Sequence, residues 1–253
     1  MTSFLMRCRM ITKTALDYEV TQTSKDGLPV IVVAAGGFTR MNGVNKQLAK
    51  IGGIPVIIRT LMAFERCDKI SDIILVVRAD DVFSMQLLTE QYNISKLSDI
   101  VCGGNCRQES VLKGLARVSE DKESVLIHDG ARPLVSTKVI ENVVEGIKLS
   151  SAVTCAVPIV DTVKLTDNNG MVEKTLDRTY LVAVQTPQAV KVKEFKTAVQ
   201  SIGDLSGFTD DTSIMEAAGF KVLIVEGESS NIKITTRSDI VMAEMLLEGS
   251  ICE

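Results

Sequence analysis

The chain has 253 residues, of which 45% are hydrophobic and 24% are charged, and its formal net charge is −4. This length and hydrophobic content allow one substantial core, so we expect one main domain. The negative balance argues against broad binding to nucleic acid or to anionic membranes, although a few Arg and Lys side chains can still build a local anion pocket.

The N-terminal residues 1–28 lack clear periodicity and contain the turn-like run 24–27, so we expect a loose extension before a single domain over residues 29–253. From Val30 to Ala35 the chain is apolar and rich in β-branched residues, which is typical of a strand buried on both faces. Similar strands then alternate with helix-period stretches. The strands are expected at Ile73–Val77, Ser124–Ile127 and Ala152–Val157, and the helices around Pro55–Glu65, Val82–Gln91, Gln108–Val118 and Thr137–Leu149. This order predicts a Rossmann-like α/β fold, with a mostly parallel sheet and helices on both faces.

Beyond Pro158 the pattern changes to short polar and apolar alternations, which pass through the hairpin signal Asp167–Gly170 and continue to Val182–Val184. We therefore expect a projecting β-arm at about 158–185. After it the α/β pattern resumes. The remaining expected elements are a helix near Val192–Ser201, a helix capped at Thr209–Asp211, a strand at Val222–Val225 and a last helix at Ser238–Leu247.

Six cysteines are spread along the chain without the spacing of a disulfide framework or of a zinc site. They are Cys8, Cys67, Cys102, Cys106, Cys155 and Cys252. We expect reduced thiols without a chemical role. No apolar run reaches the roughly eighteen residues that a membrane helix needs, so the sequence predicts a soluble cytoplasmic protein, or a plastid one in a plant-type cell.

Small residues follow the first strand, where Ala34, Ala35 and Gly36 lead into a loop that carries Arg40, with Lys46 a little further on. In open α/β sheets, ligands bind at this edge. Small residues let backbone amides approach phosphate oxygens, and the two cations would offset the phosphate charge. A plain tight turn would also use glycine here. The loop matches neither a P-loop nor a dinucleotide-binding pattern, which weakens an ATPase or NAD function.

A second glycine pair, Gly103 and Gly104, opens a helix whose first turn carries Arg107 and Ser110. Amides, a guanidinium and a hydroxyl at a helix N-terminus could bind a pyrimidine edge and phosphates. Ordinary N-capping explains the same residues, so both interpretations stay open at this motif.

Asp129 lies at the end of a buried strand and is followed by Gly130 and Arg132. Mg²⁺ typically uses one or two carboxylates together with substrate phosphates, so Asp129 and a nucleotide could complete a metal site. Asp129 could equally cap a turn or pair with Arg132. His128 is the single histidine of the chain, and we expect a structural role for it rather than proton transfer.

Seven short motifs complete the pattern when they are taken in chain order. They read AAGGFTRM…NKQ, GGNCRQES, HDGARPLV, DTVK…LDR, QTPQ, TDDTS and NIKIT, over about residues 29–248. This series resembles that of the bacterial and plastid 2-C-methyl-D-erythritol 4-phosphate cytidylyltransferases. The resemblance implies a nucleotidyltransferase type of α/β fold and transfer of CMP from CTP to 2-C-methyl-D-erythritol 4-phosphate, with release of pyrophosphate, in non-mevalonate isoprenoid precursor synthesis. Direct in-line attack by the acceptor phosphate needs no covalent intermediate.

The resemblance also implies roles for individual residues, in three groups. These are Arg40, Lys46 and Lys233 as catalytic cations; Ala34, Ala35, Gly36, Gly104, Ser110 and Asp129 for the nucleotide; and Thr162, Arg178, Thr186 and Lys233 for the acceptor. Asp129 is also the implied ligand of Mg²⁺ or another divalent cation. In the family, the matches to Thr162 and Arg178 reach from the β-arm of one subunit into the neighbouring site, which implies a homodimer.

Two other functions stay open at this point. A ribitol 5-phosphate cytidylyltransferase would share the fold, CTP and the metal, and would differ in the acceptor. A catalytically silent nucleotide-binding domain would have the fold without the activity. The presence of Arg40, Lys46, Asp129 and Lys233 argues against this function. The chain departs from the family pattern at Phe38, where a glycine is usual.

Overall fold

The structure is a computed structural model and describes residues 27–36 and 46–249. The expected N-terminal extension therefore lies almost entirely outside the described residues. So does most of the loop after the first strand, including Phe38 and Arg40.

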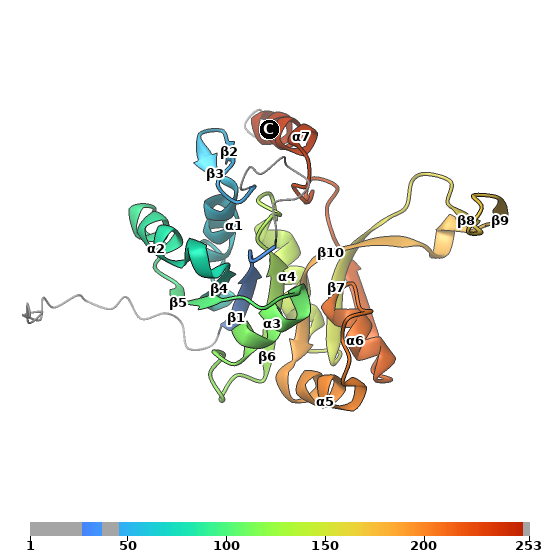
Figure 1. Ribbon diagram of the computed structural model, residues 1–253, viewed down its shortest axis with the longest axis horizontal. Coiled ribbons are helices and arrows are strands. Elements are labelled where there is room, and N and C mark those ends of the chain that lie inside the picture. The colour runs from blue at the N-terminus through green and yellow to red at the C-terminus, as the bar shows by residue number, and fades with distance from the viewer. Residues whose placement is uncertain (1–26, 37–45, 250–253) are drawn as a thin grey trace, which may run out of the picture.

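A seven-stranded sheet forms the centre of the molecule, in the order β11-β7-β10-β6-β1-β4-β5 (Figure 1). The strands are β1 (Leu28–Val33), β4 (Ile70–Val77), β5 (Leu97–Cys102), β6 (Ser124–Asp129), β7 (Ala152–Pro158), β10 (Val182–Lys191) and β11 (Val222–Glu226). All neighbours are parallel except at β10, which runs antiparallel to both β6 and β7. The expected α/β fold with a mostly parallel sheet is confirmed.

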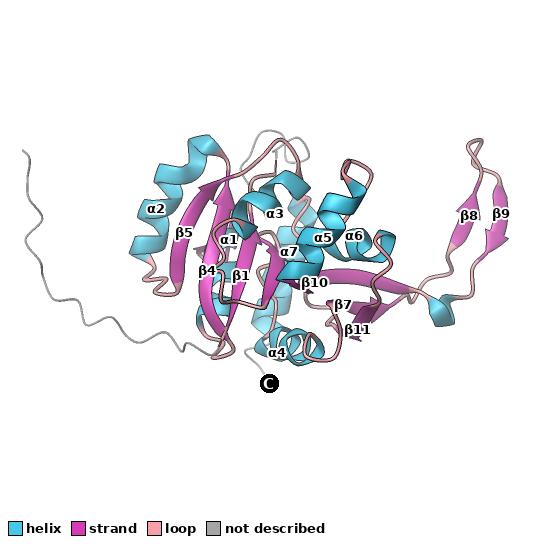
Figure 2. Cartoon of the chain, turned by 90° about the horizontal axis from the view of Figure 1, so that it is seen from below, coloured by secondary structure: helices cyan, strands magenta, loops and turns pink. Residues whose placement is uncertain are grey.

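Helices pack on both faces of this sheet (Figure 2). They are α1 (Val56–Glu65), α2 (Val82–Gln91), α3 (Arg107–Leu115), α4 (Thr137–Gly146), α5 (Val192–Ile202), α6 (Asp211–Ala217) and α7 (Arg237–Gly249), with short 3-10 turns η2 (Ala79–Asp81) and η3 (Arg178–Tyr180). Side chains of β1 alternate between two cores: Val30 and Val32 pack in the core with α1, α2 and α4, whereas Ile31 packs in the core with α3, α5 and α6. This alternation is why the strand is apolar throughout.

A smaller third core joins helix α7 to a short hairpin that precedes α1. The hairpin consists of β2 (Lys50–Ile51) and β3 (Ile54–Pro55). Ile51 and Ala243 are fully buried in this core together with Ile234. The C-terminal helix thus fixes the chain segment that follows Lys46.

The β-arm projects away from the sheet as the hairpin of β8 (Lys164–Thr166) and β9 (Val172–Thr175), as both views show (Figures 1 and 2). Its turn is closed by Asp167, whose amide donates to the carbonyl of Met171 (3.0 Å), and contains Gly170 at φ 79°. The sequence therefore predicted the arm and its turn correctly. No helix in the described part of the chain combines the length and apolar character needed to cross a membrane.

Two strands of the central sheet differ from the sequence interpretation. Strand β10 does not end at Val184 but continues through Pro187 to Lys191 in the middle of the sheet, with a register shift between Val184 and Gln188. The sequence does not indicate this continuation, because polar residues and a proline interrupt the apolar run. A proline in the middle of a sheet is usually found only at an irregularity of the strand pairing. Strand β5 was not predicted, since it lies at the sheet edge and its alternating polar residues are half-exposed.

Candidate active site

Loops from neighbouring strands meet at the carboxyl edge of the sheet. Ala34 and Ala35 follow β1, Gly103 follows β5 and Gly130 follows β6. The amide of Gly103 donates to the end of β4 (2.7 Å), and the amide of Gly130 donates to the end of β1 (2.9 Å). A Cβ at position 103 would collide with the Cβ of Ala35. Glycine at position 103 is therefore needed for its loop to approach the loop after β1.

The loop before α3 is held by its own polar groups. The amide of Gly104 donates to Ser110 Oγ (3.0 Å), and Ser110 Oγ donates to the carbonyl of Cys106 (2.9 Å). Cys106 is the N-cap of α3, with Sγ accepting from the amide of Glu109. The capping interpretation of this motif is thus correct, while its proposed contact with a nucleotide stays a prediction.

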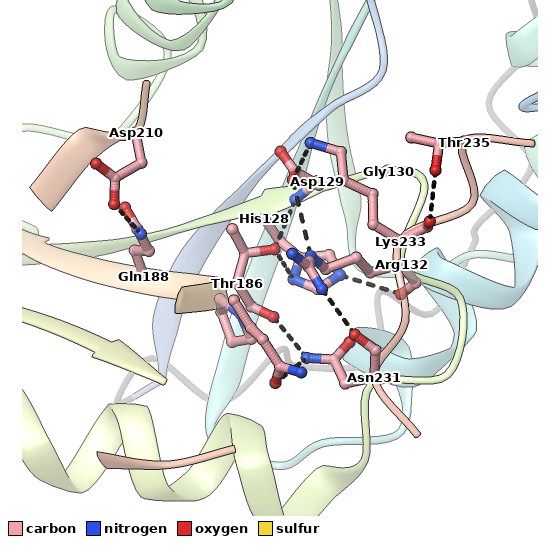
Figure 3. Close-up of polar contacts among 12 residues, drawn as sticks. His128, Asp129, Gly130, Arg132, Thr186, Gln188, Asp210, Asn231, Lys233 and Thr235 are labelled. Atoms are coloured by element: carbon pink, nitrogen blue, oxygen red, sulfur yellow. Dashed lines mark hydrogen bonds and ion pairs between the residues drawn. The ribbon is translucent and has the colours of Figure 1, made fainter. Parts of the chain in front are cut away.

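Asp129 is surrounded by three cationic side chains at the end of β6. Its carboxylate lies 2.7 Å from Lys233 Nζ, 3.3 Å from Arg107 Nε and 3.8 Å from Arg132 Nε. Burial by itself would raise the pKa of Asp129, but Lys233 and Arg107 outweigh it and hold the pKa well below its usual range. Asp129 is therefore ionised at neutral pH, and Figure 3 shows its contacts with Lys233.

Arg107 links this cluster to the start of helix α6. Its Nη2 lies 2.8 Å from Oδ2 of Asp211, a carboxylate that is fully buried. Burial lowers the pKa of Arg107, but Asp211 and Asp129 outweigh it and raise this pKa above its usual range. Arg107 Nη1 and Asp211 Oδ1 have no hydrogen-bond partner among the described residues. With Lys233 and Arg132, three cations face two carboxylates, so the cluster keeps a positive charge that suits phosphate oxygens.

His128 is buried next to Asp129 and uses both ring nitrogens. Nε2 lies 3.2 Å from the carbonyl of Arg132, to which it must donate, and Nδ1 accepts from Thr186 Oγ1 (3.0 Å). Thr186 Oγ1 in turn accepts from the amide of Asp129 (3.1 Å). Burial above all lowers the pKa of His128 to about 3, so the ring is neutral. The expected structural role of His128 fits these contacts, and Thr186 helps to fix Asp129.

Two loops that carry the cluster are joined side by side (Figure 3). Arg132 Nη1 donates to the carbonyl of Asn231 (2.7 Å), and the amide of Ile234 donates to the carbonyl of Ala131 (2.8 Å). Asn231 Nδ2 also donates to the carbonyl of Thr186 (2.9 Å). These bonds place Lys233 against Asp129 although a hundred residues separate them in the chain.

The cluster opens into a cleft of about 900 Å³. Asp129, Thr186 and Lys233 line it, and so do Arg107 and Arg132. Small-molecule sites commonly occupy roughly 300–1,000 Å³, so the volume of this cleft is sufficient for a nucleotide together with an acceptor. The structure therefore brings Asp129, Thr186 and Lys233 together, as the resemblance implied.

The other expected site residues occupy different places. Ala34 is buried beside Gly130, while Gly36 is exposed at the end of the described segment. Lys46 is half-buried just before the β2–β3 hairpin. Thr162 and Arg178 are exposed on the arm and do not line the cleft. Arg40 lies outside the described residues.

Sequence reasoning proposed Arg107 as a possible ligand of a pyrimidine or phosphates and Arg132 as a possible partner of Asp129. It gave no site role to Asp211 and did not foresee its pairing with Arg107. The run Asp210-Asp211 was interpreted as a helix cap, which is correct for Asp210, since its Oδ1 accepts from the amide of Ser213 (3.1 Å). The sequence did contain a signal for the role of Asp211, because a helix cap requires only one acidic residue and Asp210 already supplies it.

Known proteins resemble this chain along most of its length. A profile of the 2-C-methyl-D-erythritol 4-phosphate cytidylyltransferase family matches residues 28–249. A protein of that name from Clostridium novyi (strain NT) is 41% identical over 222 residues, which cover 87% of this chain and 96% of the relative. A second, from Halalkalibacterium halodurans, is 41% identical over 220 residues, which cover 86% and 96%. The solved 4-diphosphocytidyl-2C-methyl-D-erythritol synthase of Anaerococcus prevotii DSM 20548 has a TM-score of 0.78 at 32% identity, over 88% of this chain and 99% of that one.

Proposed function

The chain belongs to the 2-C-methyl-D-erythritol 4-phosphate cytidylyltransferase family, and on that premise we propose that it transfers CMP from CTP to 2-C-methyl-D-erythritol 4-phosphate. Pyrophosphate is the second product, and the reaction serves isoprenoid precursor synthesis. The observation that carries the proposal is the ionised Asp129 among Lys233, Arg107 and Arg132 at the strand-end cleft.

The reaction joins an acceptor phosphate oxygen to the α-phosphorus of CTP while the bond from that phosphorus to the pyrophosphate oxygen breaks. A phosphate monoester is already an anion near neutral pH, so it needs no general base. The buried, neutral His128 with both ring nitrogens engaged suits a site without a base. The protein's task is then to align the two phosphates and to stabilise the charge that develops between them.

Lys233 has the best position for this task among the described residues. Its side chain is 41% exposed at the cleft, so it can move from Asp129 to a phosphate without a large desolvation cost. Arg107 and Arg132 are held more rigidly and keep Asp129 in place. We assign Arg40 and Lys46 to the triphosphate, and Ala34, Ala35, Gly36, Gly104 and Ser110 to the cytidine, on the strength of the family motifs alone.

We propose Mg²⁺ as the cofactor, held by Asp129 together with phosphate oxygens. Among the described residues no group of three His, Cys, Asp or Glu side chains could hold a metal, and a magnesium–nucleotide site does not require one. The ionised carboxylate of Asp129 at the cleft fits a single protein ligand. When bound, the ion would offset the negative charge of the phosphates.

The β-arm suggests how the acceptor is held. Thr162 and Arg178 are exposed and far along the arm, where Val160 and Tyr180 are 80% and 84% exposed. We propose that the arm docks on a second copy of the chain and presents Thr162 and Arg178 to the acceptor in the partner's cleft. Thr186 and Lys233 complete the acceptor site from the subunit that holds the nucleotide.

A pyrophosphate-release assay tests the activity. CTP should support turnover with Mg²⁺ and 2-C-methyl-D-erythritol 4-phosphate, whereas ATP, UTP and GTP should be poor donors, and EDTA should stop the reaction until excess Mg²⁺ is restored. Ribitol 5-phosphate should be a poor acceptor. Faster turnover with ribitol 5-phosphate would assign the other acceptor, and no CTP-dependent release with either acceptor would indicate a silent domain.

Subunit mixing tests the dimer directly. Lys233→Ala and Arg178→Ala variants should each be impaired, but a mixed dimer contains one cleft with an intact Lys233 and an intact arm from the partner. Mixing and refolding the two variants should therefore recover up to about a quarter of the wild-type turnover, because half the dimers are mixed and each has one complete site. No recovery, with mixed dimers present, would mean that the arm acts within its own subunit.

A further inference from the structure

A second cavity is lined in part by the joined loops that carry the ion cluster. It measures about 370 Å³ and shares none of its lining residues with the active-site cleft. Helices α1 and α7 form its walls together with the segments 133–137 and 228–230. Its volume falls at the lower end of the range for small-molecule sites, roughly 300–1,000 Å³.

Two of its walls continue directly into the active site. Pro133 follows Arg132, and Ser230 precedes Asn231, whose carbonyl accepts from Arg132 Nη1 (2.7 Å). The same pair of loops therefore contributes residues to the cavity and to the ion cluster with Asp129 and Lys233. A molecule that shifts Pro133 or Ser230 would also shift the hydrogen bonds that hold the cluster.

A third connection runs through Arg59 on α1, which also lines the cavity. Arg59 Nε donates to the carbonyl of Ile51 (2.6 Å), and Nη2 donates to the carbonyl of Gly52 (3.3 Å). Both carbonyls belong to the β2–β3 hairpin region, a few residues after Lys46. The guanidinium thus fixes the segment that follows an expected triphosphate ligand.

The lining combines an apolar wall with an excess of positive charge. Met62, Leu134 and Leu246 contribute apolar surface, and Arg59 and Arg66 contribute two guanidinium groups. Burial and then repulsion by the positive charge of Arg66 lower the pKa of Arg59. An anion bound beside the two guanidinium groups would offset this repulsion. Among the described lining residues Glu228 is the one acid, and its Oε1 already accepts from Ser136 Oγ (2.8 Å).

We propose that this cavity is a regulatory site for a small amphipathic anion, a short apolar body with a phosphate or carboxylate head. The head pairs with Arg66 and draws Arg59 partly away from the carbonyls of Ile51 and Gly52. The apolar body packs against Met62 and Leu134. Binding then alters the nucleotide site through the hairpin and the joined loops. The effect on the nucleotide rests on the proposed function, whereas binding of the anion does not.

Calorimetry with the full chain and pentyl phosphate tests the site. Titration in the presence of saturating CTP, which occupies the cations of the cleft, should give saturable binding at least about tenfold tighter than that of inorganic phosphate. Pentan-1-ol, which lacks the charge, should bind at least as weakly as phosphate. Pentyl phosphate that shows no saturable binding once CTP is saturating, or that binds no better than inorganic phosphate, would overturn the proposal.

Arg66→Gln locates the binding. This exposed residue caps the C-terminal end of α1 and does not line the cleft, so its loss should weaken binding of pentyl phosphate about tenfold while basal pyrophosphate release is unchanged. Arg117→Gln, which removes an exposed arginine beyond the end of α3, is the matched control and should bind as the wild type does. Equal binding by Arg66→Gln and the wild type would contradict the assignment.

Coupling is measured as the change in Kd for CTP when pentyl phosphate is saturating. We expect a change of at least about threefold, with the reciprocal change in the Kd for pentyl phosphate. An unchanged Kd for CTP would leave a binding site and remove its regulatory role. If the wild type releases no pyrophosphate, the proposed activity fails, but the titration with pentyl phosphate still decides whether the cavity binds an anion.

Discussion

The ion cluster and the β-arm are built in opposite ways. In the cluster, Asp129 and Arg107 are 11% and 22% exposed and each contacts partners from distant parts of the chain. On the arm, Arg178 is exposed and bonds to the carbonyl of nearby Val160, and apolar side chains such as Met171 and Tyr180 face solvent.

This difference separates two kinds of site. The cluster is assembled within one chain, because Asp129 and Arg107 are largely buried, paired and positioned before any ligand arrives. The arm has no core of its own, since a two-stranded hairpin is at best marginally stable in water, and its residues can act only when something covers them. Substitutions should therefore affect stability at the cluster and acceptor binding at the arm.

The largest expected effect is at the most buried ion pair. Arg107→Ala leaves Asp211 as an uncompensated buried carboxylate, so we expect the free energy of unfolding to fall by about 3–5 kcal/mol. Urea denaturation measures the change. The control is Arg117→Ala, which breaks an exposed pair with Asp99 (3.4 Å) and should cost less than about 1 kcal/mol. Equal losses in the two variants would contradict a structural role for the buried pair.

Lys233→Ala removes a cation that we propose to act on the reacting phosphates. We expect turnover to fall by about a hundredfold or more, which corresponds to roughly 3 kcal/mol of transition-state stabilisation. Pyrophosphate release at saturating substrates measures it. Lys196→Ala, an exposed lysine of α5 that does not line the cleft, should keep normal turnover. A Lys233→Ala enzyme within threefold of the wild type (about 0.7 kcal/mol) would remove Lys233 from the mechanism.

Arg178→Ala should act on the acceptor and leave the fold intact. Loss of a charge-assisted hydrogen bond to the acceptor phosphate is worth about 2 kcal/mol, so KM for the acceptor should rise roughly thirtyfold. KM for CTP and the urea midpoint should not change. If KM for CTP rises by the same factor, the arm contributes to the nucleotide site instead, and the contrast between the two regions is weaker than we infer.

The smallest expected effect concerns pH and the buried His128. Its pKa of about 3 lies below the value of roughly 6.5 in an unfolded chain, so protons bind the unfolded state first and stability falls as pH decreases through this window. Between pH 7.5 and 5.5 the loss should be about 1.4 kcal/mol, measured by urea denaturation. His128 is the single histidine, so His128→Gln should abolish most of this slope. An unchanged slope in His128→Gln would place its origin elsewhere.

Much of the fold follows from local sequence pattern. The apolar run at Val30 predicts a strand buried on both faces, and the helix period at Val82–Gln91 predicts a helix buried on one face. Both elements form as predicted. The turn at Gly170 is set by residues that favour positive φ. Strand β10 was only partly predicted, because its apolar pattern stops at Val184 while its hydrogen bonds continue to Lys191.

The sequence by itself determined the family motifs, the strand-end position of Asp129, the glycine pair that opens helix α3, and the existence of a β-arm. Only the tertiary structure decided that Arg107 bonds both Asp129 and Asp211, and that Lys233 closes the same cluster. The physical reason is the separation along the chain of the residues that interact. Backbone geometry and burial leave a periodic trace among neighbouring residues, whereas an ion pair between residues a hundred positions apart depends on how the sheet is ordered.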